Sequence, residues 1–207
     1  MSIRIKGEYK MQKVEFMTEE ELVKYGTLIG EAFVAENDGI AATASREDII
    51  KAFEIMTEYF YKAGVLYTTS DQHEGFLAYW HKKTKKKLGL ELHMVFRMLR
   101  EMSFKGVMAV AGSGNALYTK LYKKEKDYVE VSMVVVLREF QGKGYMKKIL
   151  AHPFKEAEEL GIPCVLDTDT KLKVAKYTKC GMKNTGSKKL KSGQYLYAME
   201  YRKPAAV

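Results

Sequence analysis

The sequence has little cysteine and no long hydrophobic segment. Its 207 residues include two cysteines, Cys164 and Cys180, which are too few for a disulfide scaffold and whose spacing suits no metal site. The four histidines show no mutual spacing typical of a metal site or a catalytic triad. No apolar run approaches the length of a membrane span, and residues 1–8 contain no apolar core of a secretory signal. We therefore expect a cytoplasmic protein without a metal ion or a membrane segment.

Positive charge exceeds negative charge, and the formal net charge is +9. Lysines cluster in residues 82–87, 120–126 and 183–191. This balance fits an anionic ligand or nucleic acid, and it also fits a solvated lysine-rich surface. Aromatic residues are not interleaved with these lysines as they are in a platform that stacks bases, so nucleic acid is the less favoured partner. The length predicts one domain, residues 1–207, with a sizeable single core.

The segment from Val131 to Leu150 predicts a strand, a glycine loop and a helix. A β-branched apolar run up to Leu137 is followed by Gln141-Gly142-Lys143-Gly144, and Tyr145 and Ile149 begin a helical apolar pattern. Glycines let the backbone approach an anion, and the free N–H groups of a helix's first turn point toward it. The segment therefore indicates a phosphate-binding loop. An ordinary tight turn between a strand and a helix is the alternative.

The first half of the chain predicts two helices and a hairpin. A short strand is expected at Val14–Met17, and Thr18 with Glu21 forms a capping box for a helix that extends to about Glu36. Ser45 caps a second helix, which Gly64 ends. Two strand-like runs follow, at residues 65–69 and 75–80, and they are joined by a polar turn.

The second half adds helices and strands around the glycine loop. Helical spacing runs from Leu88 through Phe104, and another short helix is expected at about residues 117–126. After the loop come a strand (162–167), a short helix (171–180) ended by Gly181, and a closing hairpin (182–187 and 194–201). One parallel strand–helix–strand unit inside a mixed sheet predicts an α/β (or α+β) architecture.

Two motifs resemble those of the GCN5-related N-acetyltransferase (GNAT) superfamily. Gln141 to Met146 is similar to its motif A, Gln/Arg-x-x-Gly-x-Gly/Ala, with Met146 where a small residue is usual. A strand around Asp167 and then Tyr177-x-x-x-Gly181 resemble the fifth strand and the tyrosine block, with Met182 in place of Phe. Thr170 and Lys173 occupy the positions where the family often has Asn. The resemblance spans roughly residues 128–202.

The resemblance implies a fold and a cofactor. The fold is a mixed, mostly antiparallel sheet flanked by helices, and residues 88–126 form a helical insertion between strands 3 and 4. This insertion either only packs against the rest of the fold or forms a wall or lid over the acceptor pocket. The cofactor is acetyl-CoA. Its pyrophosphate would bind Gln141, Gly142, Lys143, Gly144, Tyr145 and Met146, and its pantetheine arm would pair with the main chain of Val134 and Val136.

The resemblance also implies the catalytic groups. Tyr177 stands where the family has the general acid that protonates the departing thiolate. Glu130, eleven residues before Gln141, stands where histone-acetyltransferase members carry a catalytic carboxylate. Asp167 is the rival base, and a solvated strand-edge glutamate is the alternative for Glu130.

The favoured function is therefore N-acetyl transfer by direct attack in a ternary complex. The alternative is a non-catalytic acyl-CoA-binding or regulatory module that kept the fold. A small-molecule amine is the expected acceptor. Polyamine, antibiotic, amino acid and protein N-terminus all remain open, and so does the oligomeric state.

Overall fold

The computed structural model describes residues 11–36, 39–84, 87–113, 117–190 and 193–203. Its strands form one seven-stranded sheet in the order β1-β2-β3-β4-β5-β7-β6. β4 and β5 are parallel, and every other neighbouring pair is antiparallel. This confirms the expected mixed, mostly antiparallel sheet. The strands are β1 (Gln12–Lys13), β2 (Leu66–Thr68), β3 (Gly75–His81), β4 (Val129–Val136), β5 (Cys164–Thr168), β6 (Lys183–Lys189) and β7 (Tyr195–Tyr201).

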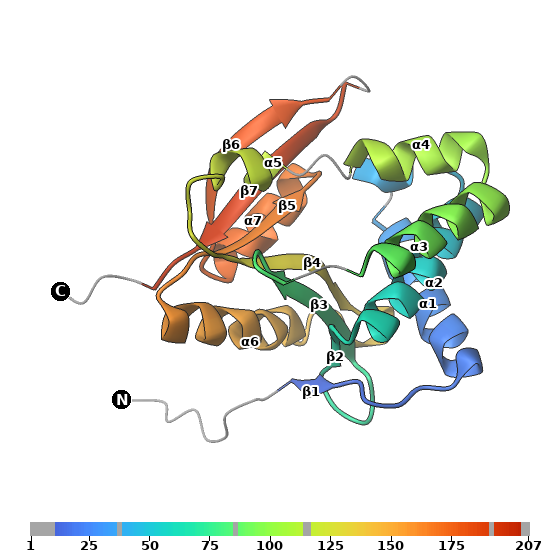
Figure 1. Cartoon of the computed structure of the whole chain (residues 1–207), viewed down its shortest axis with the longest axis horizontal. Coiled ribbons are helices and arrows are strands. Elements are labelled where there is room, and N and C mark those ends of the chain that lie inside the picture. The colour runs from blue at the N-terminus through green and yellow to red at the C-terminus, as the bar shows by residue number, and fades with distance from the viewer. Residues whose placement is uncertain (1–10, 37–38, 85–86, 114–116, 191–192, 204–207) are drawn as a thin grey trace.

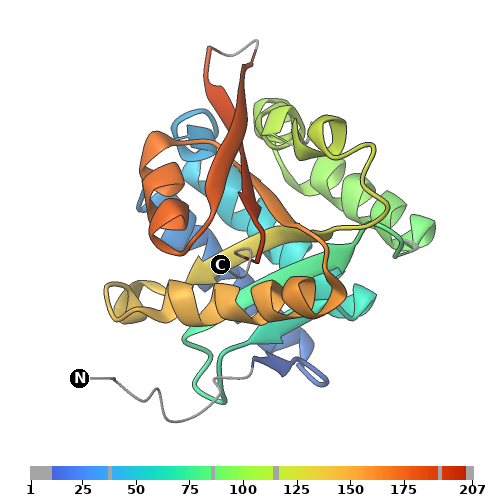
Figure 2. The same ribbon diagram turned by 90° about the vertical axis from the view of Figure 1, so that its left-hand side faces the viewer.

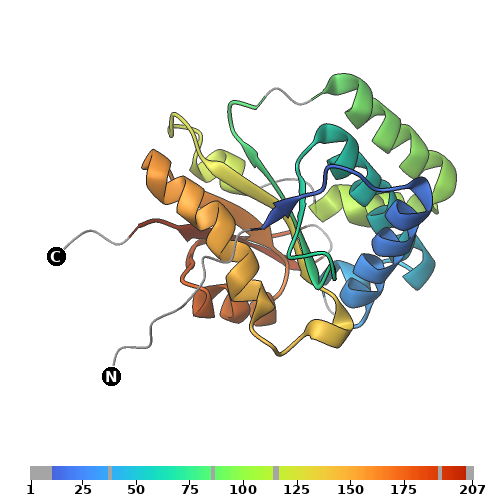
Figure 3. The same ribbon diagram turned by 90° about the horizontal axis from the view of Figure 1, so that it is seen from below.

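Helices cover both faces of this sheet. They are α1 (Glu19–Val34), α2 (Arg46–Ala63), α3 (Leu88–Glu101), α4 (Phe104–Ser113), α5 (Leu117–Leu121), α6 (Tyr145–Leu160) and α7 (Lys171–Lys179), with 3₁₀ turns η1 (Gly39–Ala42) and η2 (Arg138–Phe140). Figure 1 labels these elements, and Figure 3 shows the strands between α6 on one side and α1 to α4 on the other. Figure 2 shows α6 lying across the sheet, with the β6–β7 hairpin projecting above it.

The side chains of β4 alternate between two cores. Val134 and Val136 pack with Ile149 and Leu150 of α6, whereas Val135 packs with residues of α1 and α2 on the opposite face. Tyr177 of α7 belongs to the same core as α6. β4 is therefore buried from both sides, as its continuous apolar run requires.

Local capping and close packing explain the α1–α2 pair. Thr18 and Glu21 form the expected capping box, with Glu21 N–H donating to Thr18 Oγ1 at 3.2 Å. Gly64 ends α2 in the left-handed conformation, with φ at 76°. Gly26 and Gly30 lie against the backbone of α2, where an added Cβ would come within 2.6 Å of Glu54 Cα and 2.7 Å of Ile50 Cα respectively. The two helices therefore touch at backbone distance.

The first strand was predicted in the wrong place. β1 covers Gln12–Lys13 instead of Val14–Met17. Val14 N–H still donates to Leu66 O at 2.9 Å, but Met17 N–H donates to the hydroxyl of Tyr61 at 3.2 Å. The chain leaves the sheet there to enter α1, and Val14 and Met17 are buried by the helices rather than by a longer ladder.

The helical insertion lies between β3 and β4 as expected, but its division differs from the prediction. The helix predicted through Phe104 ends at Glu101, and a separate helix, α4, follows. Asp48 of α2 causes the break, because its carboxylate accepts hydrogen bonds from Ser103 N at 2.7 Å and Ser103 Oγ at 2.6 Å. The periodic apolar residues of α3 are mostly exposed rather than core: Leu88, Leu92, Val95, Phe96 and Leu99.

Candidate active site

β4 and β5 diverge soon after they meet. Their paired residues are Val129 with Cys164 and Glu130 with Val165. Beyond them β4 bulges, since Val131 and Met133 pair with the consecutive residues Tyr79 and Ala78 of β3 and Ser132 is the extra residue. The two strands open a gap in the middle of the sheet, and two cavities lie along it.

The main chain of Val134 and Val136 faces this gap. Leu137 N–H donates to Glu74 O at 2.9 Å, on the β3 side of the strand. Because backbone polar groups alternate sides along a strand, those of Val135 also face β3, and those of Val134 and Val136 face away from it. Gln141 Nε2 donates to Val136 O at 3.1 Å, which agrees with this direction.

The glycine loop leads into a helix start that has no side-chain cap. Gly142 and Gly144 have φ of 78° and 80°, and an added Cβ on either residue would meet nothing within 4 Å. Gly144 is the N-cap of α6 and supplies no capping side chain. The N–H groups of the first turn, from Tyr145 onward, have no intrahelical acceptors and carry the positive end of the helix dipole. This arrangement suits a phosphate group.

Tyr145 fixes the start of α6 to the β2–β3 turn. Its hydroxyl donates to Glu74 Oε1 at 3.1 Å. Glu74 Oε2 also accepts from Thr69 Oγ1 at 2.7 Å and Ser70 Oγ at 2.6 Å. Burial alone would raise the pKa of Glu74, but these hydroxyl donors outweigh it and lower that pKa to about 2.

The larger cavity, of about 560 Å³, runs from the glycine loop to α7. It collects most of the residues expected to bind the cofactor: Val134, Val136, Gln141, Gly142, Gly144, Tyr145 and Met146. Lys143 is exposed beside the loop and is not in this lining, and its Nζ lies 5.3 Å from the centroid of the Phe140 ring. Met146 packs against the core under α6, so the larger side chain at this position is accommodated. We call this the cofactor cavity.

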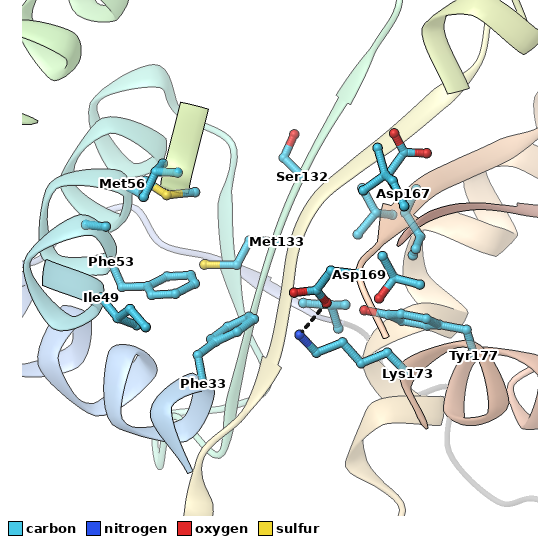
Figure 4. Close-up of a pocket in the computed structure, with 17 residues that line it drawn as sticks. Phe33, Ile49, Phe53, Met56, Ser132, Met133, Asp167, Asp169, Lys173 and Tyr177 are labelled. Atoms are coloured by element: carbon cyan, nitrogen blue, oxygen red, sulfur yellow. Dashed lines mark hydrogen bonds and ion pairs between the residues drawn. The ribbon is translucent and has the colours of Figure 1, made fainter. Parts of the chain in front are cut away.

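A second cavity, of about 310 Å³, lies on the other side of Tyr177. It has four lining residues in common with the cofactor cavity, namely Phe33, Val134, Lys173 and Tyr177. Helices α1, α2 and α4 supply its apolar side, and β5 and α7 supply its polar side (Figure 4). The two cavities meet at one buried hydroxyl, and we call the second one the acceptor cavity after the acceptor pocket that the sequence resemblance implies.

Tyr177 is that hydroxyl, and α7 positions it. Thr170 caps α7 by accepting from Lys173 N–H at 3.1 Å. In Figure 4 the phenol points toward the middle of the cavity, beside Lys173 and Asp169. Burial raises the pKa of Tyr177, and the carboxylates of Glu36 and Asp169 raise it further. The hydroxyl is therefore protonated at neutral pH.

The two candidate bases differ in how they reach the acceptor cavity. Asp167 lines it directly, and burial raises the pKa of this carboxyl to about 6 even though the N–H groups of Leu117 and Tyr118 donate to it. Glu130 is not in the lining. It accepts from Ser132 Oγ at 3.0 Å, and Ser132 lines the cavity.

A partly buried ion-pair cluster at the junction of the cavities was not predicted. Lys173 Nζ lies 2.8 Å from Asp169 Oδ1 and 3.1 Å from Glu36 Oε2, and Lys176 Nζ lies 2.9 Å from Glu36 Oε1. Glu36 follows α1 and the lysines belong to α7, so the cluster joins the two sides of the cleft. Its only local sequence signal is Lys173 at a position where the resembled family often has Asn.

No group of side chains that could hold a metal ion occurs among the described residues. None of the described helices is long and apolar enough to cross a membrane. No curated protein sequence matches the chain.

The cleft contains a strand edge opened by a bulge, a glycine loop before a helix, and a tyrosine between two cavities, which agrees with the acyl-CoA-dependent acyltransferase that the sequence motifs indicate. A family model described as "Acetyltransferase (GNAT) family" matches residues 53–182. The chain belongs to this family, and it is an acetyl-CoA-dependent acyltransferase.

Solved structures of N-acetyltransferases have the same fold. Arylalkylamine N-acetyltransferase 2 from Aedes aegypti superposes with a TM-score of 0.60 at 13% identity, over 93% of this chain and 98% of that chain. The polyamine N-acetyltransferase of Drosophila melanogaster superposes with a TM-score of 0.57 at 8% identity, over 93% of this chain and 99% of that chain. An N-acetyltransferase from Staphylococcus aureus Mu50 superposes with a TM-score of 0.53 at 14% identity, over 92% of this chain and 98% of that chain. At these identities the likeness concerns the fold alone.

Proposed function

We propose that the protein transfers the acetyl group of acetyl-CoA to the amine of a small acceptor, by direct attack in a ternary complex. One observation carries this proposal. The cofactor cavity and the acceptor cavity meet at Phe33, Val134, Lys173 and Tyr177, so a donor in one and an acceptor in the other can react without a covalent enzyme intermediate. Acetyl-CoA supplies the activated acyl group as a thioester.

The cofactor cavity supplies two kinds of backbone contact. The N–H groups of Gly142, Gly144 and the first turn of α6 bind the pyrophosphate, and Lys143 adds a nearby positive charge. The main chain of Val134 and Val136 pairs with the pantetheine amides, because its polar groups face the gap beside β5. The same main chain directs an N–H group toward the thioester carbonyl oxygen and stabilises negative charge there.

Tyr177 and Glu130 move the protons. Tyr177 donates its phenolic proton to the departing thiolate sulfur, and its raised pKa keeps that proton available at neutral pH. Glu130 acts through Ser132: Ser132 Oγ accepts a proton from the attacking amine and passes its own to Glu130. Such a base is needed because a free alkylamine has a pKa of roughly 10.4. Asp167 is the alternative base.

We also propose a single domain and a cytoplasmic location. The sheet includes strands from both ends of the described chain, since β1 starts at Gln12 and β7 ends at Tyr201. Cys164 and Cys180 are both free thiols, which fits a reducing compartment. Size measurement in solution would determine the oligomeric state.

The test combines binding and turnover. Calorimetry with CoA measures occupation of the cofactor cavity, and release of free CoA thiol with a panel of amines measures transfer. We expect CoA binding that weakens with salt, because the ligand is highly charged. We also expect one acetyl group on the accepted amine by mass spectrometry. Tight CoA binding with no acetylated amine would favour a binding module instead.

A further inference from the structure

The acceptor cavity is strongly asymmetric in polarity. Its apolar side carries Phe33, Phe53, Met56 and Val110, and the rings of Phe33 and Phe53 stack with centroids 4.1 Å apart and planes inclined by 20°. Figure 4 shows this side facing the carboxylates, Lys173 and Tyr177 across the cavity. A ligand that fills it must have one apolar end and one polar end.

The polar side has room for one positive charge. Its charged lining residues are Asp167, Asp169 and Lys173, and Asp169 is paired with Lys173 at 2.8 Å. Asp167 has no ion-pair partner among the described residues, and its contacts are the backbone N–H groups of Leu117 and Tyr118. Burial and the nearby negative charge of Glu130 raise its pKa to about 6. A cation beside Asp167 would stabilise the ionised carboxylate against both its burial and the repulsion from Glu130.

The helical insertion closes the apolar side. Asp48 holds Ser103 at the start of α4, and Gly106 lies so close that an added Cβ would come within 2.4 Å of Asp48 Cγ. Val110 is one turn beyond Gly106 on the same face of α4 and lines the cavity. The insertion therefore acts as a wall of the acceptor cavity, which is one of the two roles left open by the sequence.

We infer that the acceptor is a primary monoamine with an aromatic or alkyl body, whose ammonium group binds at Asp167 and whose body packs against Phe33, Phe53 and Val110. This inference rests on the proposed function and names its substrate class. A polyamine fits poorly, because its second ammonium would lie near the positive charge of Lys173, and the other carboxylate of the lining, Asp169, is already paired with Lys173. An amino acid fits poorly because its own carboxylate would face Asp167.

The first experiment compares 2-phenylethylamine and hexylamine with spermidine and lysine as acceptors. We expect kcat/KM for the first two to exceed that for the others by at least about tenfold, a ratio that an apolar pocket can supply. Spermidine or lysine reacting faster would overturn the acceptor class and leave the proposed acetyl transfer intact.

The second experiment measures binding without turnover, by calorimetry of 2-phenylethylamine on the CoA-bound protein. Asp167→Asn should weaken it by roughly tenfold to a hundredfold, as expected for loss of a charged hydrogen bond. Binding of the neutral 2-phenylethanol should stay unchanged. Equal weakening of both probes, or no binding of the amine to the wild type, would overturn the inference even if another amine is acetylated.

Two substitutions on α4 form a matched pair. Val110→Phe fills the cavity and should raise KM for 2-phenylethylamine by at least about tenfold. Met108→Phe places the same side chain at an exposed position of the same helix and should leave KM unchanged. Equal KM values in the two variants would show that α4 does not wall the acceptor site.

Discussion

The two glycines at the ends of α6 allow a test that separates the effect of backbone strain on stability from an effect on CoA binding. Gly144 precedes α6 with φ at 80°, and Gly161 follows it with φ at 65°. An added Cβ at either residue would meet nothing within 4 Å. Gly144→Val and Gly161→Val therefore impose the same kind of backbone strain without a clash, at opposite ends of the same helix.

The expected magnitudes follow from this geometry. A β-branched residue held in the left-handed region costs about 1–3 kcal/mol. At about 2–4 °C per kcal/mol for a chain of this size, each variant should melt roughly 2–12 °C lower. If the strained loop turns two N–H groups away from the pyrophosphate, at about 1.5–3 kcal/mol each, CoA affinity should fall roughly 10²- to 10⁴-fold. Only Gly144→Val should show this second effect.

Thermal unfolding and calorimetry with CoA measure the two quantities independently. Similar melting temperatures for the two variants, with CoA affinity lost in Gly144→Val and kept in Gly161→Val, would support the loop as the phosphate site. Unchanged affinity in both variants would refute the reasoning. Equal loss in both would mean that general loosening of α6 explains the effect.

Three further changes test the chemistry. Tyr177→Phe should lower kcat by about two to four orders of magnitude without changing CoA affinity or melting temperature, and a rate within about threefold of wild type would exclude it as the acid. Glu130→Gln should depress turnover most at low pH, whereas a constant ratio of rates across pH would mark Glu130 as structural. The Asp167→Asn variant should gain melting temperature relative to the wild type as pH rises from about 4 to 6. The reason is that the pKa of Asp167 is raised in the folded protein, so that ionisation of this carboxyl destabilises the native wild type in that pH range. A difference in melting temperature that does not change with pH would contradict this.

The sequence predicted correctly those helix ends that depend on residues close to one another in the chain. The capping box at Thr18, the cap at Ser45 and the glycines at helix ends all appear where the sequence places them. The central strand, loop and helix also agree, because apolar periodicity and positive-φ glycines act within a few residues. The predicted position of the first strand was wrong because the hydrogen bond from Met17 to Tyr61, 44 residues away, decides where the sheet ends.

The site was less predictable than the fold, for the same reason. The resemblance to the acetyltransferase family brought Tyr177, Gln141 and Val134 to one cleft, and these residues do line the cofactor cavity. The ion pair between Lys173 and Glu36 depends on two elements that meet only in the folded chain. The end of α3 is likewise decided by Asp48, which bonds Ser103 from 55 residues away.

The backbone contact between α1 and α2 at Gly26 and Gly30 has a consequence for how this enzyme adapts. Two helices that touch at glycine cannot slide or separate without losing contacts along their whole length. The part of the cavity wall that carries Phe33 and Phe53 is therefore rigid. The same apolar side also includes one turn of α4, which Asp48 of α2 holds through Ser103. Changes in the size of the accepted amine should therefore arise by substitution around Val110 while the α1–α2 pair stays constant.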